Sequence, residues 1–265
     1  MLHLTPAVTA YILTLSALLG LVLGSFSNCA AWRMAHGESV AKGRSHCGAC
    51  GHTLSPRELI PVVSWALQKG RCRHCGAPVS VRYPLTEGFT ALAFSLIVLR
   101  YDVTLDTLQF WILTLLLLAI ALVDLDTGYI PDSLVLGILL DFAVVTALRG
   151  GPFWRLWLEG IFNGAAVALP LLGLVLIMDR VLGRESMGGG DIKLIFAVGL
   201  FFHWSCNLFT LLLACLLGIA FALIFRSVRT EDGEGAFPFG PAIAAAAFLS
   251  ILAAEPVVQA YLSLF

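Results

Sequence analysis

Long apolar segments recur along most of this chain, and they constrain its fold more than any other feature. Of its 265 residues, 59% are hydrophobic and only 12% are charged, whereas a soluble globular domain carries about 25% charged residues. A segment of about 20 apolar residues is long enough to cross the hydrocarbon core of a bilayer as a helix. The sequence therefore predicts an all-α membrane protein that crosses the bilayer several times.

About eight such segments are placed by the hydrophobic pattern, with boundaries good to a few residues. We expect them near residues 7–32, 85–99, 108–123, 133–148, 158–178, 191–204 and 207–225, with the last beginning near residue 241. No Lys or Arg precedes the first segment and a long hydrophobic chain follows it, which favours a retained helix over a cleaved signal peptide. The segment near residues 191–204 is short, which favours tilting or partial burial within the protein.

A polar insert interrupts the apolar pattern over residues 33–84. It contains two CxxC pairs, Cys47 with Cys50 and Cys72 with Cys75, separated by 21 residues. Two such CxxC loops, here called cysteine knuckles, supply the four thiolates that structural zinc prefers. A pair of disulfides or a redox motif is the alternative, but a cytosolic domain keeps its thiols reduced. Because about fifty residues bury little core, we expect the insert to need zinc to fold.

The distribution of positive charge predicts which side of the membrane the insert faces. Lys and Arg gather in the insert, near residues 180–193 and after residue 225, and only Arg100, Arg149 and Arg155 of the 16 fall on the opposite side. Because positive residues favour cytosolic loops, the insert is expected in the cytosol, with both termini on the outer side.

Acidic residues cluster at two segment ends that this topology places on the cytosolic side. One cluster comprises Asp124, Asp126 and Asp132, and the other is Asp191, which follows the run Gly188-Gly189-Gly190. A carboxylate at the bilayer boundary is costly to desolvate and points to a functional site. Glycines bring no side chains and tolerate backbone angles closed to other residues, so they would let a substrate backbone approach Asp191 closely. Two converging carboxylates can share a proton and activate water for amide hydrolysis.

Several polar residues also have purely structural interpretations. Asp132 precedes an apolar segment and suits a helix cap. Lys193 either shifts the pKa of a carboxylate or extends its ammonium to the membrane interface. At the end of the first segment, Gly24, Asn28 and Arg33 either allow close helix packing or form part of a polar pocket.

Arg82 and Glu87 flank the start of the second apolar segment. They either anchor that helix at the interface or line a site beneath the insert. A proton-coupled transporter is a different class of function, but it would place acids deep within several segments. Here most acids lie at segment ends, which favours a hydrolytic site at the membrane surface.

Together these motifs resemble those of the bacterial type IV prepilin peptidases, and the resemblance covers nearly the whole chain. It is carried, in order, by Gly24-Ser25-Phe26-Ser27-Asn28 with Arg33, the two CxxC pairs, Ser80-Val81-Arg82-Tyr83-Pro84 with Glu87, the loop from Asp124 to Asp132, and Gly188-Gly189-Gly190-Asp191-Ile192-Lys193.

The resemblance implies a bifunctional aspartic protease of the GxGD type in the bacterial inner membrane, with its active site facing the cytosol. Its catalytic aspartates fall on Asp124 and Asp191. The supporting residues are Gly188, Gly189, Gly190, Lys193, Asp126 and Asp132. Such enzymes cut a basic leader from prepilins or pseudopilins in the lipid bilayer, and many then methylate the new N-terminal residue with S-adenosylmethionine.

The resemblance also divides the chain into functional parts. Residues 1–32 form the first transmembrane helix and residues 33–84 the zinc domain, which together carry methylation, while residues 85–265 form the peptidase domain. The candidate methyltransferase residues are Gly24, Asn28, Arg33, Arg82 and Glu87. A protease acting on other single-span substrates and a methyltransferase alone are the remaining alternatives, and no nucleic-acid partner is expected. The zinc insert argues against the first alternative and the paired acids against the second.

Overall fold

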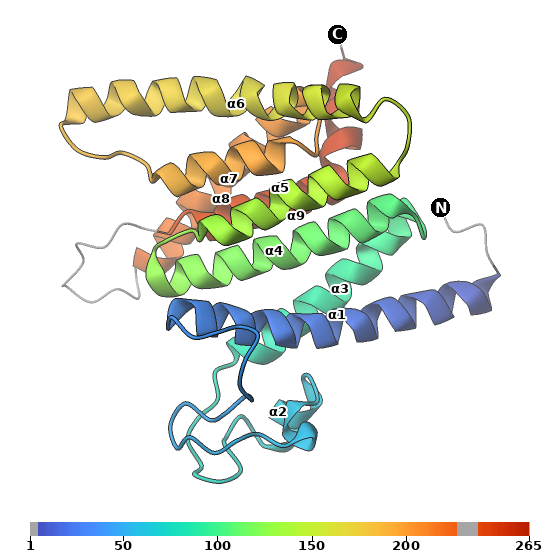
Figure 1. Cartoon of the computed structure of the whole chain (residues 1–265), viewed down its shortest axis with the longest axis vertical. Helices are drawn as coiled ribbons and strands as arrows, with labels where there is room; N and C mark the ends of the chain where they lie inside the picture. Colours follow the sequence, from blue (N-terminus) through green and yellow to red (C-terminus); the bar gives the residue numbers. More distant parts are fainter. Residues whose placement is uncertain (1–4, 227–237, 265) are drawn as a thin grey trace. The chain divides into compact units, whose positions relative to one another are not determined.

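The computed structural model describes residues 5–226 and 238–264, and helices dominate both ranges (Figure 1). No strand forms among these described residues, in which extended backbone pairs only in two isolated bridges, His46 with Thr53 and Arg71 with Pro78. The all-α class predicted from the apolar segments is therefore confirmed. The polar loop expected after residue 225, with Arg229, lies largely outside the described residues.

Eight helices follow the eight expected apolar segments one by one. They are α1 (Pro6–Ala35), α3 (Arg82–Tyr101), α4 (Leu105–Thr127), α5 (Asp132–Leu148), α6 (Phe153–Leu182), α7 (Gly189–Gly199), α8 (Trp204–Arg226) and α9 (Gly240–Leu262). Two short elements, the 3-10 helix η1 (Pro56–Leu59) and α2 (Val63–Leu67), lie in the polar insert.

Five helices in the described part of the chain are long and apolar enough to cross a membrane, namely α1, α4, α6, α8 and α9. By contrast, α5 has 17 residues and α7 has 11. At 1.5 Å per residue, α7 extends only about 16 Å, roughly half the hydrocarbon thickness. The chain thus has the helices of a multi-pass membrane protein, while the number of eight spans stays a prediction.

The first compact unit comprises residues 1–107, and its helices α1 and α3 pack along each other. Glycines allow this close packing. A Cβ at Gly20 would lie 2.6 Å from the carbonyl oxygen of Thr90, and one at Gly24 would lie 2.7 Å from Thr90 Oγ1. The polar insert leaves from the end of α1 and returns at the start of α3, so this helix pair holds both ends of the insert.

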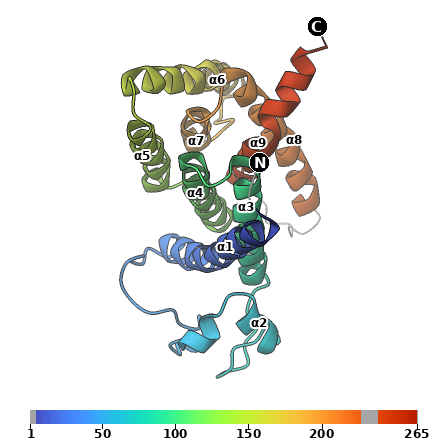
Figure 2. The same ribbon diagram turned by 90° about the vertical axis from the view of Figure 1, so that its right-hand side faces the viewer.

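The second compact unit comprises residues 108–265, in which other helices surround α7. Helix α7 contacts α5, α6, α8 and α9, and Figure 2 shows it in the middle of this group. Its side chains Leu194 and Ala197 are fully buried. Gly164 of α6 allows the closest approach, since a Cβ there would lie 2.7 Å from the carbonyl oxygen of Phe196. The partial burial predicted from the short length of this segment is confirmed.

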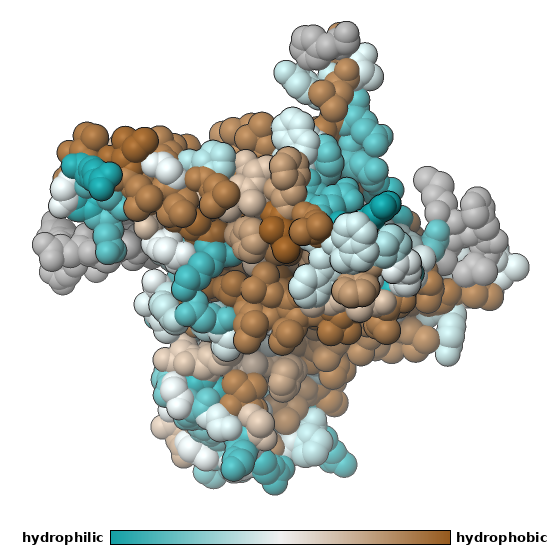
Figure 3. Space-filling model, turned by 45° about the horizontal axis from the view of Figure 1, so that its top comes forward, coloured by the Kyte–Doolittle hydropathy of each residue, from teal (hydrophilic) through white to brown (hydrophobic). Residues whose placement is uncertain are grey.

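Apolar side chains also cover much of the face seen in Figure 3. On α8, Leu212, Leu216, Ile219 and Leu223 recur at helical spacing, and each is 58–65% exposed. An apolar stripe of this kind on a helix fits contact with lipid tails rather than with water. The surface and the five apolar helices together are those of a multi-pass membrane protein.

Candidate active site and metal centre

Asp124 occupies the last turn of α4 and is almost completely buried, with 4% of its surface exposed. Its Oδ2 accepts a 2.8 Å hydrogen bond from the backbone N–H of Gly240, the first residue of α9. A Cβ at Gly240 would lie only 2.6 Å from the same oxygen. A glycine is therefore required here for α9 to approach the carboxylate. The sequence predicted only that a helix begins near residue 241, and this contact was missed.

Asp191 lies in the first turn of α7, next to Gly188, which caps this helix. Its backbone N–H donates a 3.1 Å hydrogen bond to the carbonyl oxygen of Gly188, and a Cβ on Gly188 would lie 3.2 Å from Asp191 Oδ2. The position at a helix N-terminus favours the charged form of the carboxylate, while partial burial disfavours it.

The glycine run before Asp191 has ordinary backbone angles. None of its three residues has a positive φ, so the run does not use the angles that only glycine tolerates. The run instead saves space. A Cβ on Gly190 would lie 3.1 Å from Ile130 Cβ, whereas a Cβ on Gly189 would meet nothing within 4 Å. Position 189 therefore faces open space.

The structure brings Asp124 and Asp191 together within the second unit. Asp124 lies close enough for its charge to act on Asp191, although 67 positions separate the two in sequence. Two carboxylates so placed repel when both are ionised, which favours a state in which one of the two is protonated. This arrangement suits general acid and base chemistry on one substrate.

The other expected supporting residues lie on the rim rather than between the two aspartates. Lys193 Nζ forms a 2.9 Å ion pair with Asp132 Oδ1, and both side chains are more than half exposed. This pair links α7 to the first turn of α5, where Asp132 is the first helical residue and Pro131 occupies the cap position. Asp126 is exposed near the end of α4.

The four insert cysteines converge as expected. The ligand atoms of Cys47, Cys50, Cys72 and Cys75 lie within 4.8 Å of one another. Their donor set is the one that structural zinc prefers. The pKa of the Cys47 thiol is lowered to about 6 by the backbone N–H groups of Ala49 and Cys50, so a thiolate is available to a cation at neutral pH.

The two knuckles share one backbone design. In the first, the N–H of Cys47 donates to His52 and the N–H of Gly51 donates to Cys47. In the second, Cys72, Ala77 and Gly76 make the same two bonds, at 2.8 and 2.9 Å. The rings of His52 and His74 stack on each other at 4.8 Å, and neither belongs to the group of four ligand atoms. Four thiols thus complete the set without histidine, as expected.

The candidate methyltransferase residues divide into two groups. Gly24 and Asn28 lie at the packing of α1 against α3, where Asn28 Nδ2 donates to Thr86 Oγ1 and to the carbonyl oxygen of Gly24. Arg82 begins α3, and its N–H donates to Ser80 Oγ at 3.2 Å.

Arg33 and Glu87 instead hold the backbone of the insert. The buried guanidinium of Arg33 donates from Nη1 to the carbonyl oxygens of Ser39, Val40 and Lys42 at 3.0–3.3 Å. Glu87 Oε2 accepts a 2.7 Å bond from the N–H of Val62, whose φ of 60° is unusual for a β-branched residue. Both charges therefore fix loops as well as lining a cavity.

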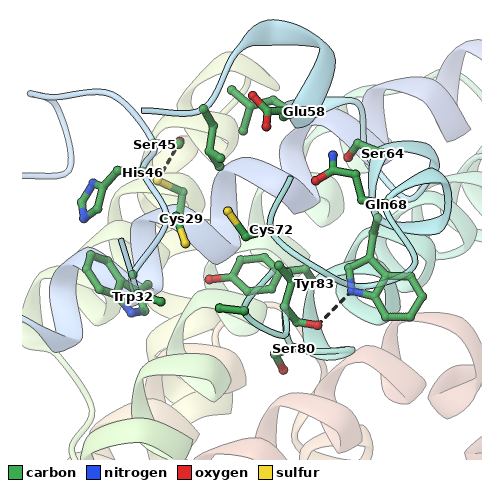
Figure 4. A pocket seen from close by; sticks show the side chains of 18 of the residues that line it. Cys29, Trp32, Ser45, His46, Glu58, Ser64, Gln68, Cys72, Ser80 and Tyr83 are labelled. Atoms are coloured by element: carbon green, nitrogen blue, oxygen red, sulfur yellow. Dashed lines mark hydrogen bonds between the residues drawn. The ribbon is translucent and has the colours of Figure 1, made fainter. Parts of the chain in front are cut away.

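That cavity has a volume of about 440 Å³ and lies within the first unit. Residues of α1, both cysteine knuckles, α2 and the start of α3 line it. Figure 4 shows Cys29 and Trp32 on one side, Glu58, Ser64 and Gln68 across from them, and Cys72 and Tyr83 between. From the sequence, a polar pocket for Arg33 and a site beneath the insert for Glu87 were alternatives, and both residues line this cavity. Gly24, Asn28 and Arg82 do not.

Comparison with known proteins covers both units. Two family models match the chain, the Bacterial Peptidase A24 N-terminal domain over residues 18–101 and the Type IV leader peptidase family over residues 111–223. The gap between the two matches, residues 102–110, contains the point after residue 107 at which the compact units divide. No solved structure matches the chain.

Curated relatives resemble the chain over most of its length. A prepilin leader peptidase/N-methyltransferase of Pseudomonas putida is 34% identical, over 92% of this chain and 91% of the relative. A protein of the same name from Bacillus subtilis (strain 168) is 31% identical, over 95% of this chain and 98% of the relative. The type 4 prepilin-like proteins leader peptide-processing enzyme of Escherichia coli O78:H11 is 35% identical, over 84% of this chain and 87% of the relative.

Proposed function

Because the chain belongs to the type IV leader peptidase family, we propose that it is a bifunctional prepilin-processing enzyme. It cleaves the basic leader from type IV prepilins or type II secretion pseudopilins and then methylates the new N-terminal residue, usually Phe. Residues 1–32 and the insert at 33–84 serve methylation, and residues 85–265 serve cleavage. The observation that carries the peptidase assignment is the convergence of Asp124 and Asp191.

In the proposed cleavage reaction the two aspartates take complementary roles. One ionised carboxylate accepts a proton from water as the water attacks the scissile carbonyl carbon. The other, protonated, donates a hydrogen bond to the carbonyl oxygen, and a proton passes to the leaving amine. The Gly240 N–H fixes Asp124 by its bond to Oδ2, so that Oδ1 stays available to the water. Such fixed geometry lowers the barrier by orienting the reactants.

The glycine run would admit the substrate to this pair. Since nothing lies within 4 Å of a Cβ position on Gly189, an extended backbone has room beside Asp191. A prepilin carries its basic leader just before an apolar helix, so the cleavage point reaches the membrane surface, where α4 ends and α7 begins. The surrounding cations Lys193 and Arg184 fit a cytosolic face of the bacterial inner membrane by the positive-inside rule.

Methylation is assigned to residues 1–84, with Glu87 of the following helix α3 beside them. S-adenosylmethionine would supply an electrophilic methyl group to the new terminal amine. The methyl–sulfur bond would break as the carbon–nitrogen bond forms, S-adenosylhomocysteine would leave, and the amine would lose a proton. The four cysteines Cys47, Cys50, Cys72 and Cys75 would hold zinc and keep the insert folded. Arg33 and Glu87 hold the loops around the cavity. Gly24 and Asn28 support the pairing of α1 with α3, and Arg82 lies at the start of α3.

The test is cleavage of a purified prepilin by the enzyme in detergent, followed by mass spectrometry of the product. Asp124→Asn and Asp191→Asn are each expected to lower the cleavage rate by about 10³-fold or more. Glu159→Gln removes an exposed carboxylate of α6 and serves as the control that keeps activity. Wild-type product should lack the leader and carry one added methyl group. Cleavage that persists in both aspartate variants would disprove the assignment.

A further inference from the structure

The cavity of the first unit has walls that the proposed peptidase does not use. It is lined on one side by the end of α1 and on the others by the cysteine knuckles, α2 and α3. We propose that it is the binding site for the methyl donor, a ligand with an adenine ring, a sulfonium and an amino-acid end. This assignment rests on the proposed methyltransferase activity and gives it a location.

The size and the aromatic walls of the cavity fit such a ligand. A volume of about 440 Å³ falls within the roughly 300–1,000 Å³ of small-molecule sites. Trp32, Trp65 and Tyr83 contribute rings to its lining. Trp65 is held in place by a 3.0 Å hydrogen bond from Nε1 to the carbonyl oxygen of Val79. Fixed rings can stack on an adenine and attract a sulfonium to their faces.

The charges around the cavity match those of the ligand in sign. Glu58 and Glu87 supply carboxylates, and Arg33 and Arg71 supply guanidiniums. The pKa of Glu58 is lowered by hydrogen bonds from the hydroxyl and the N–H of Ser55, so this carboxylate is ionised at neutral pH. The ligand offers a sulfonium and an ammonium to the carboxylates and one carboxylate to a guanidinium. The carboxylates and the guanidiniums of the cavity therefore each have a group of opposite charge on the ligand.

The same walls argue against the apolar pilin segment as the occupant. Figure 4 shows the polar side chains of Glu58, Ser64 and Gln68 together on the wall of the cavity across from Cys29 and Trp32. An apolar helix would leave these groups without hydrogen bonds, which is costly. A ligand with ribose hydroxyls and adenine nitrogens satisfies them instead. The pilin segment is thus an outcome to be tested, and the methyl donor is the occupant that the chemistry favours.

The experiment blocks the cavity with one side chain and measures binding directly. Ser64→Trp, in α2, places an indole where the lining hydroxyl stands. Ala66→Trp adds the same side chain two residues later, on the exposed face of α2 outside the cavity lining. The affinity of each full-length protein in detergent for S-adenosylhomocysteine is measured by isothermal titration calorimetry, and zinc content is measured alongside.

We expect Ser64→Trp to weaken binding by about tenfold or more, with Ala66→Trp and wild type equal and zinc content unchanged in all three. If Ser64→Trp binds S-adenosylhomocysteine as tightly as wild type, the assignment is overturned. If that variant binds normally but no longer methylates a cleaved pilin, the cavity holds the pilin rather than the methyl donor. If Ser64→Trp loses zinc, the Gln68→Ala variant tests the assignment in its place, because it adds no bulk to the cavity. It should weaken the binding of S-adenosylhomocysteine by about three- to tenfold, and unchanged affinity would overturn the assignment.

Failure of the proposed function has a different signature. If the wild-type enzyme neither binds S-adenosylhomocysteine nor methylates a cleaved pilin, the proposed methyltransferase activity is disproved, and the proposed donor site with it. If the wild type binds and methylates, and Ser64→Trp has equal affinity, only the assignment of the donor to this cavity is disproved.

Discussion

The backbone N–H of Gly240 donates a 2.8 Å hydrogen bond to Oδ2 of Asp124, joining the first residue of α9 to the last turn of α4. The bond crosses 116 positions of sequence. It leaves no space for a side chain, since a Cβ on Gly240 would lie 2.6 Å from Oδ2 and 3.1 Å from Cγ of the carboxylate. One backbone group thus both solvates and orients a buried acid.

Gly240→Ala is therefore expected to impair cleavage. The added methyl group must displace either the carboxylate of Asp124 or the start of α9, and a displacement of about 1 Å can cost about 10²-fold in rate. The measurement is kcat/KM for a purified prepilin. Gly173→Ala is the matched control, because it adds the same methyl group to α6 where nothing lies within 4 Å. A Gly240→Ala enzyme as active as this control would show that the contact does not orient Asp124.

Local sequence signals were sufficient to place the helices. Apolar runs and their polar boundaries located every long helix, because a segment that must satisfy its backbone groups within lipid has few alternatives to a helix. The spacing of Cys47, Cys50, Cys72 and Cys75 likewise identified the convergence of four thiols, since each knuckle closes through bonds only a few residues apart.

Long-range contacts were beyond the same reasoning. The partner of Asp124 is a backbone N–H, which every residue except proline carries, so no residue type marks Gly240 in advance. Arg33 was offered as part of a polar pocket and does line the cavity, but its bonds to three backbone carbonyls of the loop that follows α1 could not be foreseen. The cavity arises only when α1, α2 and α3 are brought together with the two knuckles.

Gly24 was a candidate for either helix packing or a polar pocket, and its surroundings favour packing. A Cβ there would lie 2.7 Å from Thr90 Oγ1 and 3.2 Å from Glu87 Cα, and Gly24 does not line the cavity. Gly24→Ala should therefore lower the free energy of unfolding by about 1–3 kcal/mol without changing the affinity for S-adenosylhomocysteine.

The comparison is made by thermal or denaturant unfolding in detergent, with Gly88→Ala as the control. Gly88 lies on α3 with nothing within 4 Å of a Cβ, so alanine there should be neutral or stabilising by helix propensity. If Gly24→Ala unfolds like Gly88→Ala but loses ligand affinity, Gly24 belongs to the binding site instead of the helix contact.

The cysteine cluster predicts that zinc holds the insert folded. Wild-type protein should contain about one zinc ion per chain, and Cys50→Ser should lose most of it, because a hydroxyl is a poor replacement for a thiolate. Without the metal, the insert has too little buried core to stay folded. Limited proteolysis should then cut within residues 33–84 and leave the helices outside the insert intact.

His74→Ala is the control: the ring of His74 stacks on His52 outside the four ligand atoms, so zinc content and protease resistance should match wild type. Zinc loss in His74→Ala equal to that in Cys50→Ser would make histidine a ligand and contradict the four-thiolate site.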